Sequence, residues 1–191
     1  MVDRIRRVIG ALGALGLALA PFRPDRALAE ANTAWDFTFT SIEGEAMPLA
    51  RWRGRPLLVV NTASFCGFTP QYAALQALWE RYEPRGLVVV GVPSNDFRQE
   101  QTDNAAVKRF CEVEFGVSFP LAEISRVTGR EAHPFYRWAA AVAGPPRWNF
   151  HKYLVDRAGR IVGAWGARTA PDSPDLIAAI EAALAAPPPS A

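Results

Sequence analysis

The sequence predicts an α/β domain with a central mixed β-sheet that is flanked by helices on both faces. Two continuous apolar runs, at residues 57–60 and 87–90, are typical of strands that are buried on both faces. A segment with helical periodicity follows each run, and a strand–turn–strand pattern comes near the C-terminus. Strands that alternate with helices form parallel pairs, whereas a closing hairpin adds antiparallel ones, so one sheet is expected to contain both.

Turn residues and helix-start residues delimit the elements of the first half. Residues 43–45 (Glu-Gly-Glu) form a turn between extended segments at 37–39 and 47–52, which predicts an N-terminal β-hairpin. After the first buried strand and a loop, Pro70 stands where a helix would begin, because the first helical position tolerates proline. Apolar residues then recur at helical spacing as far as Tyr82.

The second half repeats the alternation and closes with a hairpin and a helix. Pro93 ends the second buried strand, and Thr102 or Asp103 is expected to cap a helix over 105–115. The remaining elements are a short extended segment at 119–121, a helix at 133–142, a hairpin of 153–155 and 161–162 around the turn 156–159, and a helix at 174–185. This order of elements is thioredoxin-like, and it indicates a single domain.

The N-terminal segment has the features of a secretory signal peptide. Three arginines among the first seven residues precede an apolar run at 8–20, and residues 27–29 offer the small-x-small pattern that signal peptidase accepts. We therefore expect cleavage after Ala29 and export, to the periplasm, with no stable membrane association afterwards. The alternative is that the apolar run remains as a membrane anchor, although it is shorter than the roughly 17 residues that a spanning helix usually needs.

These signals divide the chain into four segments. The expected segments are a signal peptide at 1–29, a linker at 30–36, the folded domain at 37–186 and a disordered, proline-rich tail at 187–191. Residues 1–29 contain five Arg and two Asp, a net charge of +3; since the whole chain carries +2, the remaining residues carry −1. Such a domain is not expected to bind nucleic acid. Two cysteines are too few for a small scaffold built on disulfides.

Cys66 is the residue whose position most clearly predicts chemistry. It follows a buried strand, at the edge where open α/β sheets place their sites. It also precedes a helix N-terminus, whose free N–H groups and dipole favour a thiolate. The alternative is an inert buried thiol, but such a cysteine would more often lie within the apolar run itself.

The residue three positions after Cys66 is Thr69, so the chain has no Cys-x-x-Cys motif at this site. This argues against a thioredoxin-type disulfide exchanger, which needs its second thiol next to the first. A lone activated thiol suits attack on an electrophile such as a peroxide, because the sulfenic acid that forms can be reduced by a second thiol. A thiol–disulfide oxidoreductase of the periplasm and a peroxide sensor or binding module on the same fold remain the alternatives.

Three ordered motifs resemble the signatures of the glutathione peroxidase family. They are residues 59–69 (VVNTASFCGFT), 91–97 (GVPSNDF) and 148–156 (WNFHKYLVD). The resemblance runs from about Phe37 to the last helix. It implies a thiol-dependent peroxidase that reduces hydrogen peroxide or organic hydroperoxides through a sulfenic acid on Cys66, without a cofactor. The reductant that it implies is a thioredoxin-like protein or glutathione.

The resemblance also implies a set of groups around the thiol. The Trp and Asn of the family's site fall on Trp148 and Asn149, whose N–H groups can hold a thiolate and then an alkoxide. The Gln falls on Gln99, although the loop is one residue shorter than the family's pattern, so Gln101 is the alternative. Read without the resemblance, each of these residues could equally be a core aromatic or a polar loop residue.

Cys111, on the helix expected at 105–115, is the candidate resolving cysteine that the resemblance implies. It lies one position earlier than the usual pattern, and a disulfide needs Cα atoms within about 7 Å, so this segment would have to move or unwind. A half-buried structural thiol is the alternative. His133 and His151 have no metal-ligand spacing and are interpreted as a helix-start residue and a strand residue.

Overall fold

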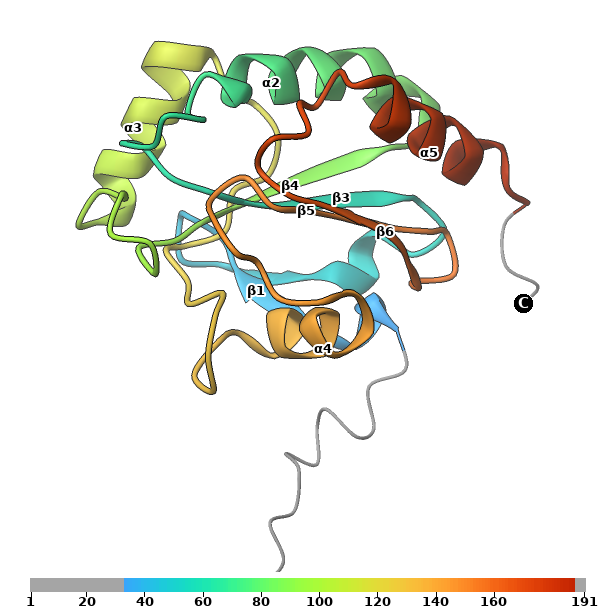
Figure 1. The fold of residues 1–191 in the computed structure, drawn as a ribbon, viewed down its shortest axis with the longest axis horizontal. Helices are drawn as coiled ribbons and strands as arrows, with labels where there is room; N and C mark the ends of the chain where they lie inside the picture. Colours follow the sequence, from blue (N-terminus) through green and yellow to red (C-terminus); the bar gives the residue numbers. More distant parts are fainter. Residues whose placement is uncertain (1–32, 188–191) are drawn as a thin grey trace, which may run out of the picture.

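The computed structural model describes residues 33–187 and confirms the thioredoxin-like α/β class (Figure 1). The strands and α-helices are β1 Thr38–Thr40, β2 Ala46–Pro48, β3 Leu57–Thr62, α2 Gln71–Tyr82, β4 Val88–Pro93, α3 Asn104–Phe115, α4 Pro134–Ala143, β5 Lys152–Val155, β6 Ile161–Trp165 and α5 Pro174–Ala185. Short 3-10 helices are η1 Ala34–Asp36, η2 Leu49–Trp52 and η3 Glu83–Arg85.

The larger sheet is mixed, as the sequence predicts. Its four strands lie in the order β4-β3-β5-β6, with β3 parallel to β4 and antiparallel to β5, and β5 antiparallel to β6. Every residue of β3 and β4 is buried, which fits their continuous apolar runs. The hairpin of β1 and β2 forms a separate two-stranded sheet, in which Phe39 pairs with Met47.

Two hydrophobic clusters fill the space on either side of this sheet. Leu58, Val60 and Leu154 face α2, α3 and α5, whereas Leu57, Val59 and Val155 face α4 and the hairpin. Figure 1 shows the same division, with α2, α3 and α5 on one side of the sheet and α4 with β1 on the other. Because side chains alternate along a strand, one strand supplies both clusters, and the sheet is covered on both faces.

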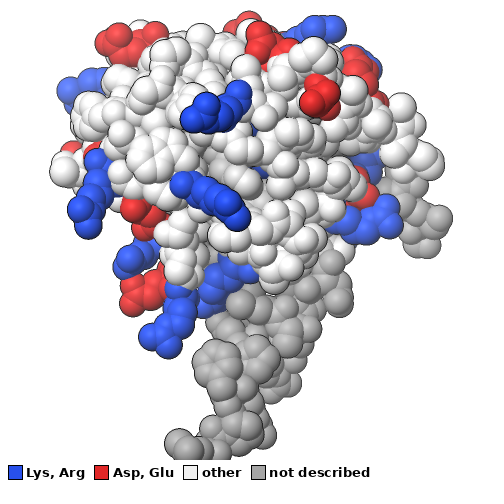
Figure 2. All heavy atoms as spheres, in the orientation of Figure 1, with Lys and Arg blue, Asp and Glu red and all other residues white. Residues whose placement is uncertain are grey.

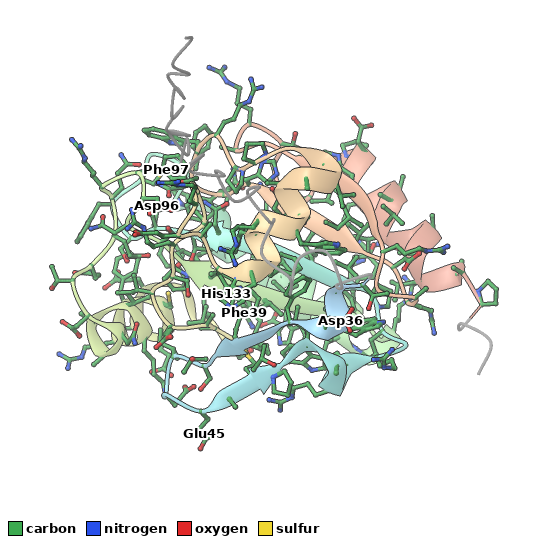
Figure 3. The ribbon with its side chains drawn as sticks, turned by 90° about the horizontal axis from the view of Figure 1, so that it is seen from below. Asp36, Phe39, Glu45, Asp96, Phe97 and His133 are labelled. Carbon is green, nitrogen blue, oxygen red and sulfur yellow. The ribbon has the colours of Figure 1, made fainter. Side chains whose placement is uncertain are left out.

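The helix ends agree with the local sequence signals. Asp103 caps α3 by accepting a hydrogen bond from the Ala106 amide at 2.8 Å, which selects it over Thr102. His133 caps α4: its Nδ1 accepts from the Phe135 amide at 3.2 Å. Its ring stacks on Phe39, with centroids 3.9 Å apart, and Figure 3 shows the two side by side. Its expected role at a helix start is therefore confirmed.

Two expectations near the N-terminus are wrong. Residues 34–36, expected in a linker, form η1, and the buried Trp35 packs against the turn after β5. A Cβ on Gly159 would lie 2.5 Å from Trp35 Nε1, so only glycine leaves room for this indole. Residues 49–52, expected to continue the second hairpin strand, form η2 instead, because the strand ends at Pro48.

The expected signal peptide at 1–29, the first residues of the expected linker and the last four residues of the expected tail lie outside the described residues. Within residues 33–187, none of the helices is both long enough and apolar enough to cross a bilayer. On the face turned to the viewer in Figure 2, uncharged atoms cover most of the surface, and basic and acidic side chains are interspersed around it.

Candidate active site

Three loops meet at one edge of the larger sheet. The first follows the end of β3 and the second follows the end of β4, and Thr62 lies opposite Pro93 at the ends of these parallel strands. The third, residues 148–151, leads into β5, whose first residue Lys152 pairs with Val60 of β3. This is the edge at which open α/β sheets place their sites.

Cys66 lies in the tight turns between β3 and α2. Its side chain belongs to the hydrophobic cluster beneath α2 but retains 6% exposure. The Phe68 amide donates to its Sγ at 3.4 Å, and an N–H aimed at sulfur stabilises negative charge there. Thr69 fixes the turn, because its Oγ1 accepts from the Cys66 amide at 3.0 Å and donates to the Ala63 carbonyl at 2.9 Å. The thiol is therefore held next to a backbone donor and close to the surface.

The second loop is bonded to the first. The Phe65 amide donates to the Gln99 carbonyl at 2.9 Å. The buried carboxylate of Glu100 accepts through Oε1 from the Ser64 amide at 3.0 Å, from the Ser64 hydroxyl and from the Gln101 amide at 2.8 Å. Burial raises the pKa of Glu100, whereas these hydrogen bonds oppose the rise. Glu100 therefore holds the chain two residues before Cys66.

The third loop brings Asn149 and Trp148 to the second. The Nδ2 of Asn149, which is fully buried, donates to Gln99 Oε1 at 2.9 Å. The Trp148 ring packs on Phe97, with centroids 5.3 Å apart, and is 42% exposed. Phe97 and Asp96 lie together in Figure 3, in the loop that also carries Gln99. The structure thus joins the segments of the predicted Gln, Trp and Asn through side-chain contacts.

Gln101 lies elsewhere. It borders a groove along α3 together with Ala106, Phe110 and Val113, and its backbone amide is engaged by Glu100. Of the two glutamines weighed from the sequence, Gln99 is the one whose side chain contacts Asn149.

Asn61 of β3 holds the third loop in place by four hydrogen bonds. Its Nδ2 donates to the Trp148 carbonyl at 3.1 Å, and its Oδ1 accepts from the His151 amide at 3.1 Å. Its backbone carbonyl accepts from the Phe150 amide, and its backbone amide donates to the His151 carbonyl. Phe150 has a φ of 61°, a conformation that is costly for an aromatic residue. The clamp from Asn61 stabilises this turn, which sets the direction of Trp148 and Asn149.

An open hollow of about 540 Å³ adjoins the site. Its lining residues are Phe68, Trp148, Gly166, Ala167, Arg168 and Thr169. Phe65, next to Cys66, is 61% exposed. An exposed aromatic ring thus precedes Cys66 in the loop, and Phe68, two residues after it, lines the hollow, which Arg168 borders as its basic residue.

Cys111 lies in α3, one turn before that helix ends at Phe115. Its side chain has no exposed surface and packs in the same hydrophobic cluster as Cys66, and both thiols are free. Burial, followed by the negative charges of Glu100 and Glu112, raises the pKa of Cys111 to about 11, against a contact with the Tyr72 hydroxyl that lowers it. As packed, Cys111 is thus a protonated core thiol.

The structure adds three residues to those predicted for the site: Asn61, Glu100 and Lys152. All lie within or beside the three sequence motifs, but a motif alone does not say which of its polar residues are buried. Lys152 is fully buried, and burial lowers its pKa to about 7. His151 lies beside Tyr153, and its pKa is lowered to about 4 by burial and by the charge of Lys152. Within residues 33–187, no three His, Cys, Asp or Glu side chains gather as a metal site requires.

Comparisons with known proteins place the chain among relatives of one kind. A sequence model described as glutathione peroxidase matches residues 34–140. Hydroperoxy fatty acid reductase gpx1 of Synechocystis is 41% identical over 165 residues, which cover 80% of this chain and 96% of the relative. The glutathione peroxidase-like peroxiredoxin HYR1 of Saccharomyces cerevisiae is 35% identical over 138 residues, which cover 69% of this chain and 85% of the relative.

Solved structures give the same result at the level of the fold. The crystal structure of Trgpx in apo form superposes with a TM-score of 0.67 at 30% identity and covers 83% of this chain and 99% of its own. A DsbE-type thiol:disulfide interchange protein from Chlorobium tepidum superposes with a TM-score of 0.58 over 80% of this chain and 95% of its own. At 20% identity, the latter shows a common fold alone.

Proposed function

The chain belongs to the glutathione peroxidase family and is a thiol-dependent peroxidase, and on that premise we propose that Cys66 is the thiol that attacks the peroxide. Gln99, Trp148 and Asn149 are proposed as the groups that stabilise the reacting oxygen. The observation that carries this assignment is the bond between Asn149 and Gln99, side chains fifty residues apart, at the edge of the sheet where the loop of Cys66 begins.

The proposed reaction begins with the thiolate of Cys66. Its sulfur bonds to one oxygen of the hydroperoxide, the O–O bond breaks, and the other oxygen leaves as an alcohol or as water after it takes up a proton. The indole N–H of Trp148 and the amide N–H groups of Asn149 and Gln99 are donors, so they stabilise the charge that develops on the leaving oxygen. The product on the enzyme is a sulfenic acid.

Cys111 is proposed to resolve this sulfenic acid. A sulfur–sulfur bond forms, the S–O bond of Cys66 breaks, and the hydroxide leaves as water with the proton of the Cys111 thiol. Cys111 is four residues from the end of α3, so unwinding the last turn would release it from the core. Two external thiols then reduce the disulfide and are themselves oxidised to a disulfide.

The test is the intact mass of the reduced protein after one equivalent of peroxide. A loss of two hydrogens is expected if a bridge between Cys66 and Cys111 forms, and the Cys111→Ser chain should instead gain one oxygen. Cys66→Ser should lose peroxide turnover, measured in a stopped-flow assay with excess thiol. Turnover that survives in Cys66→Ser would refute the assignment of Cys66, and a gain of one oxygen in the unmodified chain would refute only the role of Cys111.

The reductant is proposed to be a thioredoxin-like protein rather than glutathione. A resolving cysteine yields an internal disulfide, and dithiol proteins reduce such bonds efficiently. The preferred substrates are proposed to be organic hydroperoxides with apolar groups, because Phe65 next to Cys66 is exposed and Phe68 shares an open hollow with the exposed Trp148. Steady-state assays that compare thioredoxin with glutathione, and cumene hydroperoxide with hydrogen peroxide, test both points; equal kcat/KM values in either comparison would contradict the corresponding proposal.

Export to the periplasm is proposed on the sequence signals of residues 1–29. The mature chain would then begin at Glu30, four residues before η1. N-terminal sequencing of protein recovered from the periplasmic fraction tests this, and an intact Met1 in the membrane fraction would favour the anchored form.

A further inference from the structure

Lys152 is an unusual choice of residue for its position. The chain has 21 basic residues, of which two, Lys108 and Lys152, are lysines. Lys108 is on the surface of α3 in an ion pair with Glu43, whereas Lys152 has no exposed surface. Lys152 lies opposite Val60 in the sheet, so its side chain extends into the face covered by α2.

The amine of Lys152 joins two parts of the site. Its Nζ donates to the Phe150 carbonyl at 2.7 Å and to Gln71 Oε1 at 2.7 Å. Gln71 is the first residue of α2, and its Nε2 donates to the Ala167 carbonyl at 2.6 Å, in the loop that lines the hollow beside Trp148. The buried Lys152 side chain therefore links the turn after Asn149 to the start of α2, the helix that follows Cys66. Through Gln71 the link extends to Ala167, which lines the hollow.

The chemistry of an amine suits this link. Both partners of Lys152 are uncharged, and burial is the cause that lowers its pKa to about 7. A neutral amine has two N–H groups, and the site offers two acceptors, so the link persists in either protonation state. An arginine could not give up its charge in this interior. This accounts for a lysine at a buried position in a chain that otherwise relies on arginine.

The link acts on a strained turn. Phe150 holds a positive φ, which costs about 1–3 kcal/mol for a residue with a side chain, and its carbonyl is the group that Lys152 bonds. Without that bond, relaxation of Phe150 toward an ordinary conformation would rotate the preceding residues. Those residues are Trp148 and Asn149.

We propose that Lys152 is a positioning residue for the peroxidase reaction: by bonding the Phe150 carbonyl and Gln71, it holds Trp148 and Asn149 in register with the Cys66 loop. The inference rests on the proposed function of these residues. In this role Lys152 does not contact the substrate. Its loss should therefore slow the peroxide reaction, which uses Trp148 and Asn149, but should not slow reactions of Cys66 with electrophiles that need no hydrogen-bond donor.

The test compares two electrophiles on the same thiol. In a Cys111→Ser background, Cys66 is the single cysteine of the chain. Its rate of loss is measured by quenched mass spectrometry with excess hydrogen peroxide and, separately, with iodoacetamide, whose iodide leaving group needs no hydrogen-bond donor. Lys152→Met, which has similar length and no donors, should react about 10- to 100-fold more slowly with peroxide, as expected for a misplacement of about 1 Å. Its alkylation rate should stay within about twofold of the parent.

Lys108→Met is the matched control, and both of its rates should equal those of the parent. An unchanged peroxide rate in Lys152→Met would overturn the proposal, and so would an equal fall in both rates, since that would indicate a general loss of structure. If Lys152→Met does not fold, Gln71→Leu removes one of the two acceptors from a partly exposed position. A several-fold slower peroxide reaction with unchanged alkylation is then expected, and no change would overturn the proposal. A failure of Cys66→Ser to lose turnover would refute the proposed function instead, independently of Lys152.

Discussion

Glu100 provides the sharpest test of how the loop of Cys66 is held. Its Oε1 accepts three hydrogen bonds, from the Ser64 amide, the Ser64 hydroxyl and the Gln101 amide, whereas its Oε2 is buried without a hydrogen-bond partner among the described residues. Glu100→Ala removes all three bonds. At a net value of about 0.5–1.5 kcal/mol each, their loss should lower the free energy of unfolding by about 1.5–4.5 kcal/mol. The peroxide reaction of Cys66 should slow as well, because Ser64 is two residues away.

Glu100→Gln is the informative counterpart. It keeps one oxygen where Oε1 lies and removes the charge whose burial raises the pKa of the carboxyl. Above its unfolded pKa, the folded protein holds this proton more tightly than the unfolded chain, so the stability of the unmodified protein falls as pH rises through that window. Glu100→Gln lacks this dependence. At pH 7 its free energy of unfolding should therefore lie no more than about 1 kcal/mol below that of the unmodified protein, and it should exceed that of Glu100→Ala.

The free energies of unfolding of the unmodified protein, Glu100→Ala and Glu100→Gln are measured by urea unfolding between pH 4 and pH 8, with tryptophan fluorescence as the signal. The reasoning is refuted if Glu100→Ala and Glu100→Gln have equal midpoints, because the three bonds at Oε1 would then contribute nothing. It is refuted in its electrostatic part if the gap between Glu100→Gln and the unmodified protein does not change with pH.

Three further predictions concern the clamp, the sheet and the buried amine. Asn61→Ala should slow peroxide reduction at least about tenfold, since the turn that carries Trp148 loses two side-chain hydrogen bonds; an unchanged stopped-flow rate would contradict this. Gly91→Ala should lower the free energy of unfolding by about 1–3 kcal/mol in urea, because the new methyl group would lie 2.6 Å from Leu121 Cδ2. Lys152, with its pKa lowered to about 7, takes up a proton on unfolding between pH 7 and pH 10.5, so stability should rise with pH relative to Lys152→Met, by up to about 1.4 kcal/mol per unit. If the free energies of unfolding of the two chains differ by the same amount at pH 7.5 and at pH 9.5, that last effect is excluded.

The elements that the sequence predicts well are those whose signals are local. Runs of four apolar residues predicted β3 and β4, and Pro174 marked the start of α5 to the residue. The start of α3 was predicted to within one residue, because Asp103 is a strong capping residue. In contrast, η1 was missed: Trp35 is buried by contact with Gly159, a residue more than a hundred positions away.

The partners of the site could be predicted only in part, for the same reason. The sequence leaves two candidates, Gln99 and Gln101, for the catalytic glutamine, because the loop is one residue shorter than the family's pattern and can be aligned with it in two ways. The hydrogen bond from Asn149 favours Gln99. The clamp by Asn61 and the link by Lys152 depend on side chains that approach across 81 to 90 residues of chain. Composition and periodicity carry no information on such pairs, so their burial was visible only in the structure.

Strained backbone lies next to both amides that we propose as catalytic groups. Among the described residues, two non-glycine residues have positive φ, and each adjoins a proposed site residue: Arg98 at 58° precedes Gln99, and Phe150 at 61° follows Asn149. Each conformation costs about 1–3 kcal/mol. At Phe150 the bonds from Asn61 and Lys152 offset this strain, and at Arg98 the contacts of the Gln99 loop offset it. The bond between the two amides occupies Gln99 Oε1, and this leaves Gln99 Nε2 as a donor. Under the proposed function, donors that folding has already oriented need no reorganisation when charge develops on the leaving oxygen. The free energy needed to orient them is therefore part of folding and does not add to the barrier of the reaction.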